Sequence, residues 1–183
     1  AYEIMPSLVG SEMCIRDRII NCEKPIVSIV NGLAFGGGME LNLLFDIVIA
    51  SNDSTFAVPE VKIGALPPIA SSIGVALYGK KFIEFILTGE TLEAEEAKEF
   101  GIVNVVVDSE QLEDVAIEYA EKIALSAPRS ISSIRKILAE IYATYNLPFK
   151  VAMREILLST QLEDFKVGTG AFVKKKKSEW RGR

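Results

Sequence analysis

A run of three glycines, Gly36 to Gly38, constrains this chain more than any other feature of its sequence. It follows an apolar run, Ile26 to Val30, and precedes a helix-like run that begins near Leu41. Glycine adopts backbone conformations that a Cβ would forbid, and it lets a ligand approach the main chain closely. The first turn of the following helix presents unpaired N–H groups, which suit a phosphate, a carboxylate or a developing oxyanion. We therefore expect an anion-stabilising site at these glycines, with Glu40 as an acid one turn into the helix.

The composition excludes several classes of chemistry. The chain has 183 residues, enough for one domain with a core, and its net charge of -5 argues against general nucleic-acid binding. It contains no histidine, so acid–base work falls to carboxylates, lysine or tyrosine. Cys14 and Cys22 form no metal or disulfide pattern, and no apolar run is long enough to span a bilayer. We expect no metal, no cofactor and no membrane or nucleic-acid partner, and a cytoplasmic setting is the default.

The first 18 residues fit neither a helical nor a strand period. They also resemble a translated sequencing-adapter string, and we interpret residues 1–18 as a non-native segment. The alternative is an irregular native arm.

Residues 19–107 have the pattern of an α/β core, in which a strand–helix–strand order predicts a parallel crossover. The predicted strands are Ile26–Val30, Ile47–Ala50, Thr55–Val58 and Val103–Val107. The predicted helices are Gly37–Phe45, which Asp46 caps or ends, Ser71–Tyr78, Lys81–Leu87, and one that Thr91 caps and Gly101 stops.

Residues 108–183 are predicted to be helical. Asp108, followed three residues later by a glutamine, is a capping-box start, and further helices begin near Pro128 and Asn146, the last running through Leu162. The apolar stripes of these helices are wide, which is typical of surfaces that pack on neighbouring subunits. Tyrosines in these stripes and in the preceding helices are expected in the core or at an interface: Tyr78, Tyr119, Tyr142 and Tyr145.

The glycine run belongs to an ordered set of motifs that resembles the crotonase (enoyl-CoA hydratase/isomerase) family from about residue 19 to the end. The motifs are Lys24–Val27, Asn31–Gly32, Gly36–Leu41, Asp46–Ile47, Phe56–Glu60, Leu87–Gly89, Ala94–Ala97, Gly101–Val103 and Ala171–Val173. A triple glycine alone is a weak signal, whereas the whole set with its spacing is specific. The resemblance implies an α/β fold, the ClpP/crotonase spiral of ββα units, followed by a C-terminal helical trimerisation region. It also implies a homotrimer or a dimer of trimers.

The resemblance also implies a reaction, the addition of water to the C=C of an enoyl-CoA thioester. The thioester oxygen would bind two backbone N–H groups, one of them matching Gly37, with Gly36 and Pro59 also in contact with the substrate. Two glutamates that match Glu40 and Glu60 would hold the water. The Glu60 counterpart transfers the proton at the α-carbon, and the Glu40 counterpart orients or activates the water. Coenzyme A is then part of the substrate rather than a cofactor.

Several alternatives stay open. The glycines could form only a tight packing turn, Glu40 could only compensate the helix dipole, and Glu60 could be a solvated loop acid. Within the family, the chain could be an isomerase or a CoA-thioester hydrolase. Two acids favour hydration, because shifting a double bond needs no water. Residues 66–72 resemble cyclic dienoyl-CoA hydratases rather than the Gly-rich segment of straight-chain hydratases.

Two further expectations come from the resemblance. Family members carry an earlier segment, roughly Phe-Cys-Ala-Gly-Ala-Asp, that supplies the second oxyanion N–H, and nothing in this chain matches it. We therefore expect the C-terminal part of a longer fold, with an inactive truncated fragment as one alternative for its activity. At the other end, Phe172 and Lys175 would approach the coenzyme A of a neighbouring subunit. The alternative is that residues 174–177 are a solvated basic tail.

Overall fold

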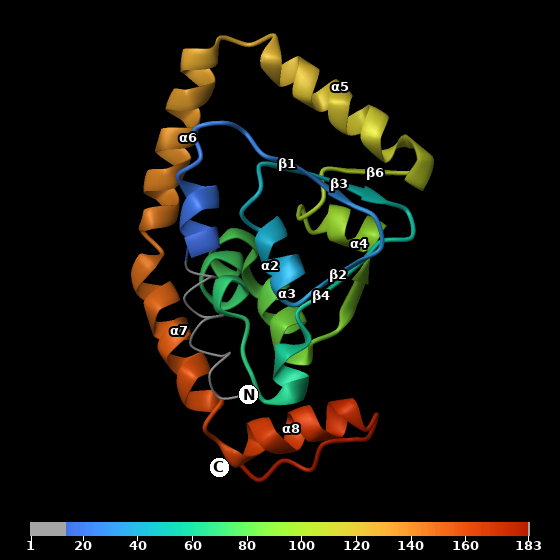
Figure 1. The fold of residues 1–183 in the computed structure, drawn as a ribbon, viewed down its shortest axis with the longest axis vertical. Helices are drawn as coiled ribbons and strands as arrows, with labels where there is room; N and C mark the ends of the chain where they lie inside the picture. The colour runs from blue at the N-terminus through green and yellow to red at the C-terminus, as the bar shows by residue number, and fades with distance from the viewer. Residues whose placement is uncertain (1–13, 183) are drawn as a thin grey trace.

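The computed structural model describes residues 14–182 and contains two small sheets (Figure 1). The first sheet has the order β1-β3-β6 and is parallel throughout, and the second has the order β2-β4-β5. Their bounds are β1 Val27–Val30, β2 Leu33–Phe35, β3 Ile47–Ser51, β4 Thr55–Ala57, β5 Thr91–Glu93 and β6 Val105–Val107.

The predicted parallel crossover is confirmed. β1 pairs in parallel with β3, from Val27 opposite Ile47 to Val30 opposite Ala50, and helix α2 (Gly37–Asn42) lies between them in the chain. The central strand β3 is apolar because it is covered on both faces: Val48, Ile49 and Ala50 are buried. The helix ends three residues earlier than predicted, with its C-cap at Leu43.

The second sheet differs from the prediction at two strands. β2 lies inside the glycine motif and pairs in parallel with β4, and β5 pairs antiparallel with β4. Thr91 therefore begins a strand, and the prediction that it caps a helix is wrong. The cap of α4 (Ala94–Glu99) is Glu93, whose side chain forms a capping box with Glu96. A glutamate at this position satisfies the first backbone N–H groups as a threonine would.

Three helical segments connect β4 to β5 within the second sheet. They are the 3₁₀ helix η1 (Pro59–Ile63), the π-helical turn η2 (Ala70–Gly74) and α3 (Val75–Thr88). The predicted interruption at Gly79 is confirmed, because its φ of 69° and ψ of -146° break α3 into two helical pieces.

The C-terminal half is helical, as predicted, but with one more helix. After the 3₁₀ turn η3 (Ser109–Gln111), the helices are α5 Leu112–Ala124, α6 Pro128–Ala143, α7 Asn146–Ser159 and α8 Glu163–Val173. Figure 1 shows α6 and α7 along one side of the molecule and α8 across one end. The predicted capping box at Asp108 is wrong, because its carboxylate instead accepts a hydrogen bond from Asn52 Nδ2 at 2.8 Å.

The described part of the N-terminal segment is also ordered. Residues 14–20 are helical, and the buried Arg16 stacks over the ring of Phe149 at 4.2 Å. Its guanidinium also donates to Asn146 Oδ1 at 2.9 Å, which joins this helix to α7. Residues 1–13 lie outside the described residues, and the interpretation of residues 1–18 as non-native stays a prediction.

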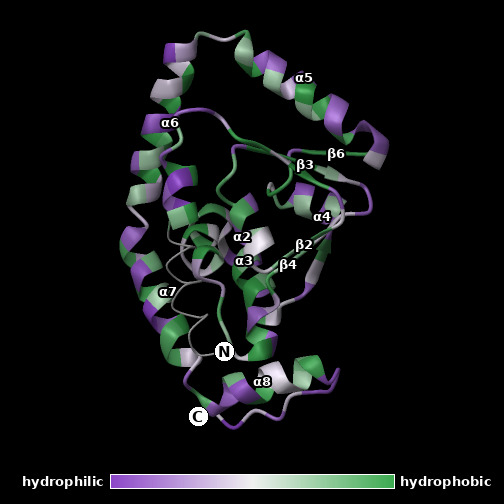
Figure 2. Cartoon of the chain, viewed as in Figure 1, coloured by the Kyte–Doolittle hydropathy of each residue, from purple (hydrophilic) through white to green (hydrophobic). Residues whose placement is uncertain are grey.

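The largest buried side chains lie between α2, the sheets and α3, and they include Met39, Leu44, Phe56 and Phe82. Apolar side chains are nevertheless exposed on the helical half. Figure 2 shows that apolar and polar residues alternate along α5, α6 and α7. The exposed apolar side chains of α6 are Ile134, Ile137 and Ile141. The edge strands β1 and β2 expose Ile29, Leu33 and Phe35 in the same way. Within residues 14–182, no helix combines the length and the apolar character that crossing a membrane requires.

Candidate active site

The glycine segment is fixed at both of its ends. Before it, Gly32 turns the chain from β1 into β2 with a φ of 111° and donates its N–H to the buried Ser54 Oγ at 3.0 Å. After β2, the N–H of Gly36 donates to the carbonyl of Ala57 at 2.9 Å. Gly36 then leaves the strand with a φ of 58° and a ψ of -127°, a conformation that a Cβ disfavours. Glycine is needed here because the chain turns from strand to helix within one residue.

The first turn of α2 is open to approach from outside. Gly37 and Gly38 are exposed, and a Cβ added to either would meet no atom within 4 Å. The first N–H groups of a helix have no partner within that helix. A small oxygen-bearing ligand can therefore reach the backbone here, as the sequence predicts.

Glu40 points into the protein from this turn. Only 4% of the residue is exposed, and its Oε1 accepts the N–H of Ala70 in η2 at 2.7 Å. This bond links α2 to the segment that begins at Leu66. Glu40 is therefore a buried, hydrogen-bonded acid rather than a surface acid that only compensates the helix dipole.

Glu60 approaches the same turn from β4, the strand that pairs with β2 in the second sheet. It follows Pro59, which takes the first position of η1, where a proline ring suits the helix start. Its Oε1 lies 3.0 Å from the position that a Cβ of Gly36 would occupy. The carboxylate is therefore placed directly against the residue that precedes α2. The structure brings Gly36, Gly37, Glu40 and Glu60 to one region of the molecule.

Phe172 and Lys175 lie on a different part of the chain. Phe172 is 70% exposed near the end of α8, and Lys175 is exposed with a φ of 51°. The helix α8 packs on η1 of the same chain. The predicted approach of these residues to a neighbouring subunit stays a prediction.

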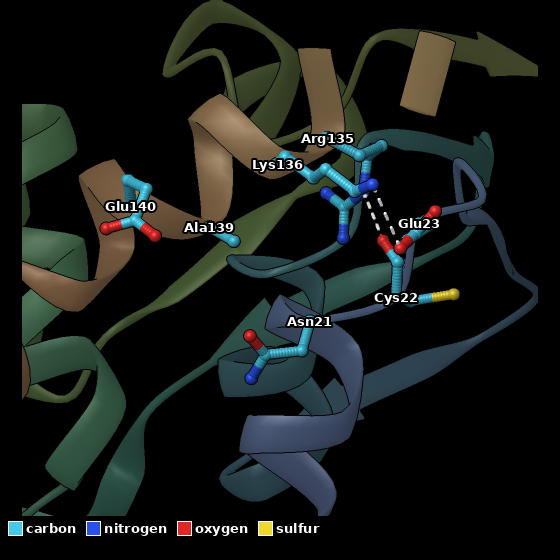
Figure 3. A pocket seen from close by; sticks show the side chains of 7 residues that line it. All are labelled: Asn21, Cys22, Glu23, Arg135, Lys136, Ala139 and Glu140. Carbon is cyan, nitrogen blue, oxygen red and sulfur yellow. Dashed lines mark hydrogen bonds and ion pairs between the residues drawn. The ribbon is translucent and has the colours of Figure 1, made fainter. Parts of the chain in front are cut away.

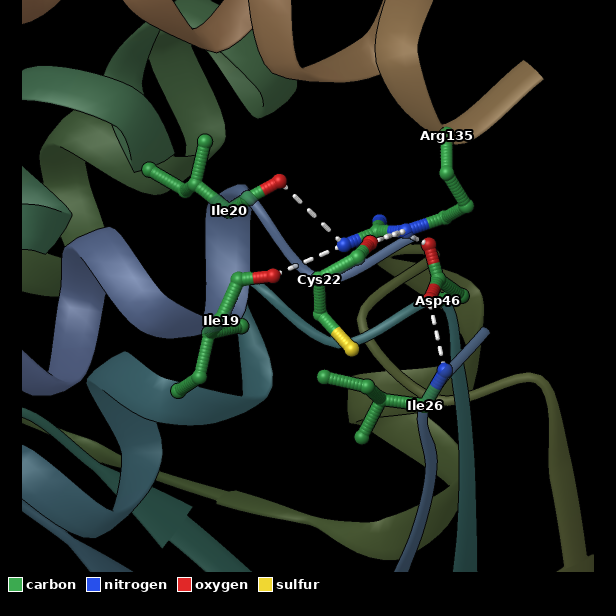
Figure 4. Close-up of polar contacts among 6 residues, drawn as sticks. All are labelled: Ile19, Ile20, Cys22, Ile26, Asp46 and Arg135. Atoms are coloured by element: carbon green, nitrogen blue, oxygen red, sulfur yellow. Dashed lines mark hydrogen bonds and ion pairs between the residues drawn. The ribbon is translucent and has the colours of Figure 1, made fainter. Parts of the chain in front are cut away.

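Asp46 has a role that the sequence analysis missed. It does not cap or end α2. Its Oδ2 accepts the N–H of Ile26 at 2.7 Å, and its Oδ1 pairs with Arg135 of α6. Arg135 is 2% exposed and also donates to the carbonyls of Ile19, Ile20 and Cys22 (Figure 4). This network holds the start of β1 to α6, outside the candidate site.

A polar pocket of about 180 Å³ lies beside the Arg135 network (Figure 3). Two of its charged side chains, Lys136 and Glu23, pair with each other at 3.3 Å, and Arg135 pairs with Asp46. None of the glycines or acids of the candidate site lines it. We therefore do not assign it to the chemistry.

Other candidate acid–base groups and metal ligands do not converge on the glycine turn. Burial raises the pKa of Tyr78 to about 12 and also raises the pKa of Tyr142, so both phenols stay neutral in the core. No cluster of metal-ligating side chains occurs among residues 14–182.

Comparisons with known proteins identify the family. The profile of the enoyl-CoA hydratase/isomerase family matches residues 13–183. A carnitinyl-CoA dehydratase from Citrobacter koseri is 34% identical over 175 residues, which cover 90% of this chain and 66% of the relative. This chain thus spans slightly less than two thirds of the length of that relative.

Solved structures agree with the sequence comparison. A carnitinyl-CoA dehydratase from Mycobacterium avium 104 superposes with a TM-score of 0.82 at 32% identity, over 88% of this chain and 65% of that one. A methylmalonyl-CoA decarboxylase superposes with a TM-score of 0.79 at 29% identity, over 94% of this chain and 69% of that one. The predicted crotonase fold is confirmed, and this chain belongs to the enoyl-CoA hydratase/isomerase family.

Proposed function

We propose that the protein of which this chain forms at least a part is an acyl-CoA lyase that adds water to a C=C bond conjugated to a thioester, or removes it. The observation that carries the proposal is the position of the Glu60 carboxylate against Gly36, beside an open first turn of α2 that also bears Glu40. Carnitinyl-CoA dehydratase, the name of several relatives, describes the removal of water from an acyl-CoA. The family resemblance and these names both support a lyase that adds water to an acyl-CoA or removes it.

In this proposal the thioester oxygen accepts the N–H of Gly37. When a nucleophile adds to the β-carbon, negative charge moves onto that oxygen, and a fixed donor stabilises it more strongly than it stabilises the ground state. Loss of one such donor typically costs about 3 kcal/mol of transition-state stabilisation. Glu60 would exchange a proton with the α-carbon, and Glu40 would orient or activate the water.

One observation favours isomerisation as a second candidate. Glu40 is almost fully buried and one of its oxygens already accepts the N–H of Ala70, whereas Glu60 is only half-buried. A single accessible acid is enough to move a double bond, because the proton leaves one carbon and returns to another.

Substitution of the two glutamates separates the candidates. For a hydratase we expect Glu40→Gln and Glu60→Gln each to lower kcat by at least about 100-fold, since each acid contributes to proton transfer or water activation. The assay is hydration or dehydration across straight-chain enoyl-CoA, carnitinyl-CoA and cyclic dienoyl-CoA substrates. If Glu40→Gln keeps its turnover while Glu60→Gln loses it, the hydratase proposal fails in favour of the isomerase.

We also propose self-association through the helical half, as a trimer or a dimer of trimers. The exposed apolar side chains of α6 and α7, such as Ile137 at 61% and Leu147 at 72%, support an interface there. Sedimentation should show an assembly larger than one chain, and Ile137→Glu should shift it toward the monomer. A well-folded monomer at every concentration would contradict this proposal.

A further inference from the structure

The first turn of α2 has little of its own to hold it in place. The helix has six residues, which is too short to be stable in isolation. Its first two residues are glycines, and no atom lies within 4 Å of where their Cβ atoms would be. Glycine also retains more backbone freedom than any other residue. A fixed direction for the N–H of Gly37 therefore needs a contact from outside the turn's own backbone.

A buried amide side chain provides that contact. Asn42 is 6% exposed, and its Nδ2 donates to the carbonyl of Gly38 at 2.9 Å. Its Oδ1 accepts the hydroxyl of Ser28 at 2.8 Å. Ser28 lies within β1, where it pairs with Val48 of β3. The chain Ser28–Asn42–Gly38 thus runs from the sheet to the glycine turn.

Both ends of the Asn42 amide are used, and this fixes its orientation. The reverse orientation would place the amide oxygen against the carbonyl of Gly38, and two acceptors repel. Asparagine is also a weak helix former, because its side chain competes for backbone groups. Its presence at the end of α2 is explained by the connection that it makes rather than by helix propensity.

We propose that Asn42, anchored by Ser28, is a positioning residue that fixes the first turn of α2 against β1. The N–H of Gly37 and the backbone of Glu40 then keep one direction toward a ligand at the turn. The identity of this ligand as an acyl-CoA thioester rests on the proposed function. The two hydrogen bonds of Asn42, to Ser28 and to Gly38, are present in the chain without any ligand.

The first test measures backbone amide exchange by NMR in the ligand-free chain. The amide of Glu40 donates to the carbonyl of Gly36 at 3.0 Å and reports opening of the turn. Asn42→Ala should speed its exchange about tenfold, the effect of one lost hydrogen bond, while the core amide of Ile49 is unchanged. The matched control is Asn52→Ala, which removes an exposed amide–carboxylate bond to Asp108 and should leave Glu40 unchanged. Unchanged exchange at Glu40 in Asn42→Ala would overturn the proposal.

A second pair of variants keeps the test decisive if Asn42→Ala fails to fold. Ser28→Ala removes only the anchor, and it should speed Glu40 exchange by a smaller factor. Ser28→Thr keeps a hydroxyl at the same position and should restore slow exchange. If Glu40 exchange in Ser28→Ala does not differ from that in the unsubstituted chain, the anchor has no role and the proposal is wrong.

The ligand arm uses a saturated acyl-CoA labelled with ¹³C at the thioester carbonyl. Polarisation by a fixed N–H moves this resonance downfield, a signature that a merely structural contact would not produce. Asn42→Ala should reduce that shift and weaken binding several-fold, and Ser28→Thr should not. If this chain by itself binds no acyl-CoA, the exchange result alone decides the role of Asn42, because the proposed function concerns the protein of which this chain forms at least a part. If binding occurs and Asn42→Ala leaves the shift intact, the positioning role is overturned.

Discussion

At the scale of single residues, Gly36 combines two constraints. Its φ of 58° with a ψ of -127° is unfavourable for any residue with a side chain, and Glu60 Oε1 occupies the space a Cβ would need. Gly38, two residues later, is helical and has free space around it. The two glycines of one motif therefore have different roles. Gly36 allows the backbone conformation of the turn, and Gly38 leaves the backbone accessible to a ligand.

This difference predicts opposite effects of alanine at the two positions. Gly36→Ala should lower the free energy of unfolding by about 2 kcal/mol, because strain of this kind costs roughly 1–3 kcal/mol. Gly38→Ala should raise it by about 0.5 kcal/mol, since alanine favours a helix over glycine. Urea denaturation of both variants measures these values. Equal effects at the two sites would show that the conformation of Gly36 is not the constraint.

At the scale of elements, the position of Glu60 depends on a close contact between η1 and α8. A Cβ on Gly168 would lie 2.5 Å from the carbonyl carbon of Ile63, and one on Gly64 would lie 2.9 Å from the carbonyl oxygen of Asp164. The two backbones approach each other because neither glycine has a side chain. The short helix that carries Glu60 is thus supported from outside by the last helix of the chain.

Gly168→Ala should separate these two elements. The added methyl group meets the backbone of Ile63 as well as the ring of Trp180, and overpacking of this kind costs about 1–3 kcal/mol. We expect faster amide exchange throughout α8 and in η1. Gly170→Ala is the matched control, because a Cβ at Gly170 meets no atom within 4 Å. If both variants leave exchange in α8 unchanged, the contact is not close in solution.

The elements that the sequence predicted are those whose signal is local. The apolar, β-branched run before the glycines predicts β1, and Pro128 marks the start of α6. The strands β2 and β5 were missed because β2 lies within the glycine motif and β5 directly precedes α4, and both depend on pairing with β4. Glu40 was found from its position one turn into the helix that follows the glycines, and Glu60 was found through the family resemblance. Asn42 was not, because its role depends on Ser28, fourteen residues earlier, and no pattern links the two.

At the scale of the whole molecule, Arg135 joins parts of the chain that are far apart in sequence. Its guanidinium contacts Ile19, Ile20 and Cys22 near one end and Asp46 at the start of β3 (Figure 4). The sequence gives no sign of this role, because an arginine in an amphipathic helix resembles the residues of its polar face. Lys136, the next residue, is such a surface residue, with a side chain 63% exposed.

Substitution of Arg135 should therefore lower the free energy of unfolding much more than substitution of the neighbouring Lys136. Arg135→Ala leaves the Asp46 carboxylate and three carbonyls without their donor, and breaking a buried pair typically costs about 3–5 kcal/mol. Lys136→Ala removes only an exposed ion pair with Glu23, which is worth about 0–1 kcal/mol. Chemical denaturation of the two variants tests this. A loss below about 1 kcal/mol for Arg135→Ala would mean that the network does not stabilise the fold.

The Arg135 network also constrains the order in which the chain can mature during its own synthesis. The carbonyl of Cys22 is made 113 residues before its partner. At typical translation rates of roughly 5–20 residues per second, that partner follows after roughly 6–23 s. During this interval β1 can already pair with β3, but the carbonyl of Cys22 lacks the arginine that binds it in the finished fold. The attachment of Cys22 to α6 therefore forms late in synthesis, after α6 has left the ribosome.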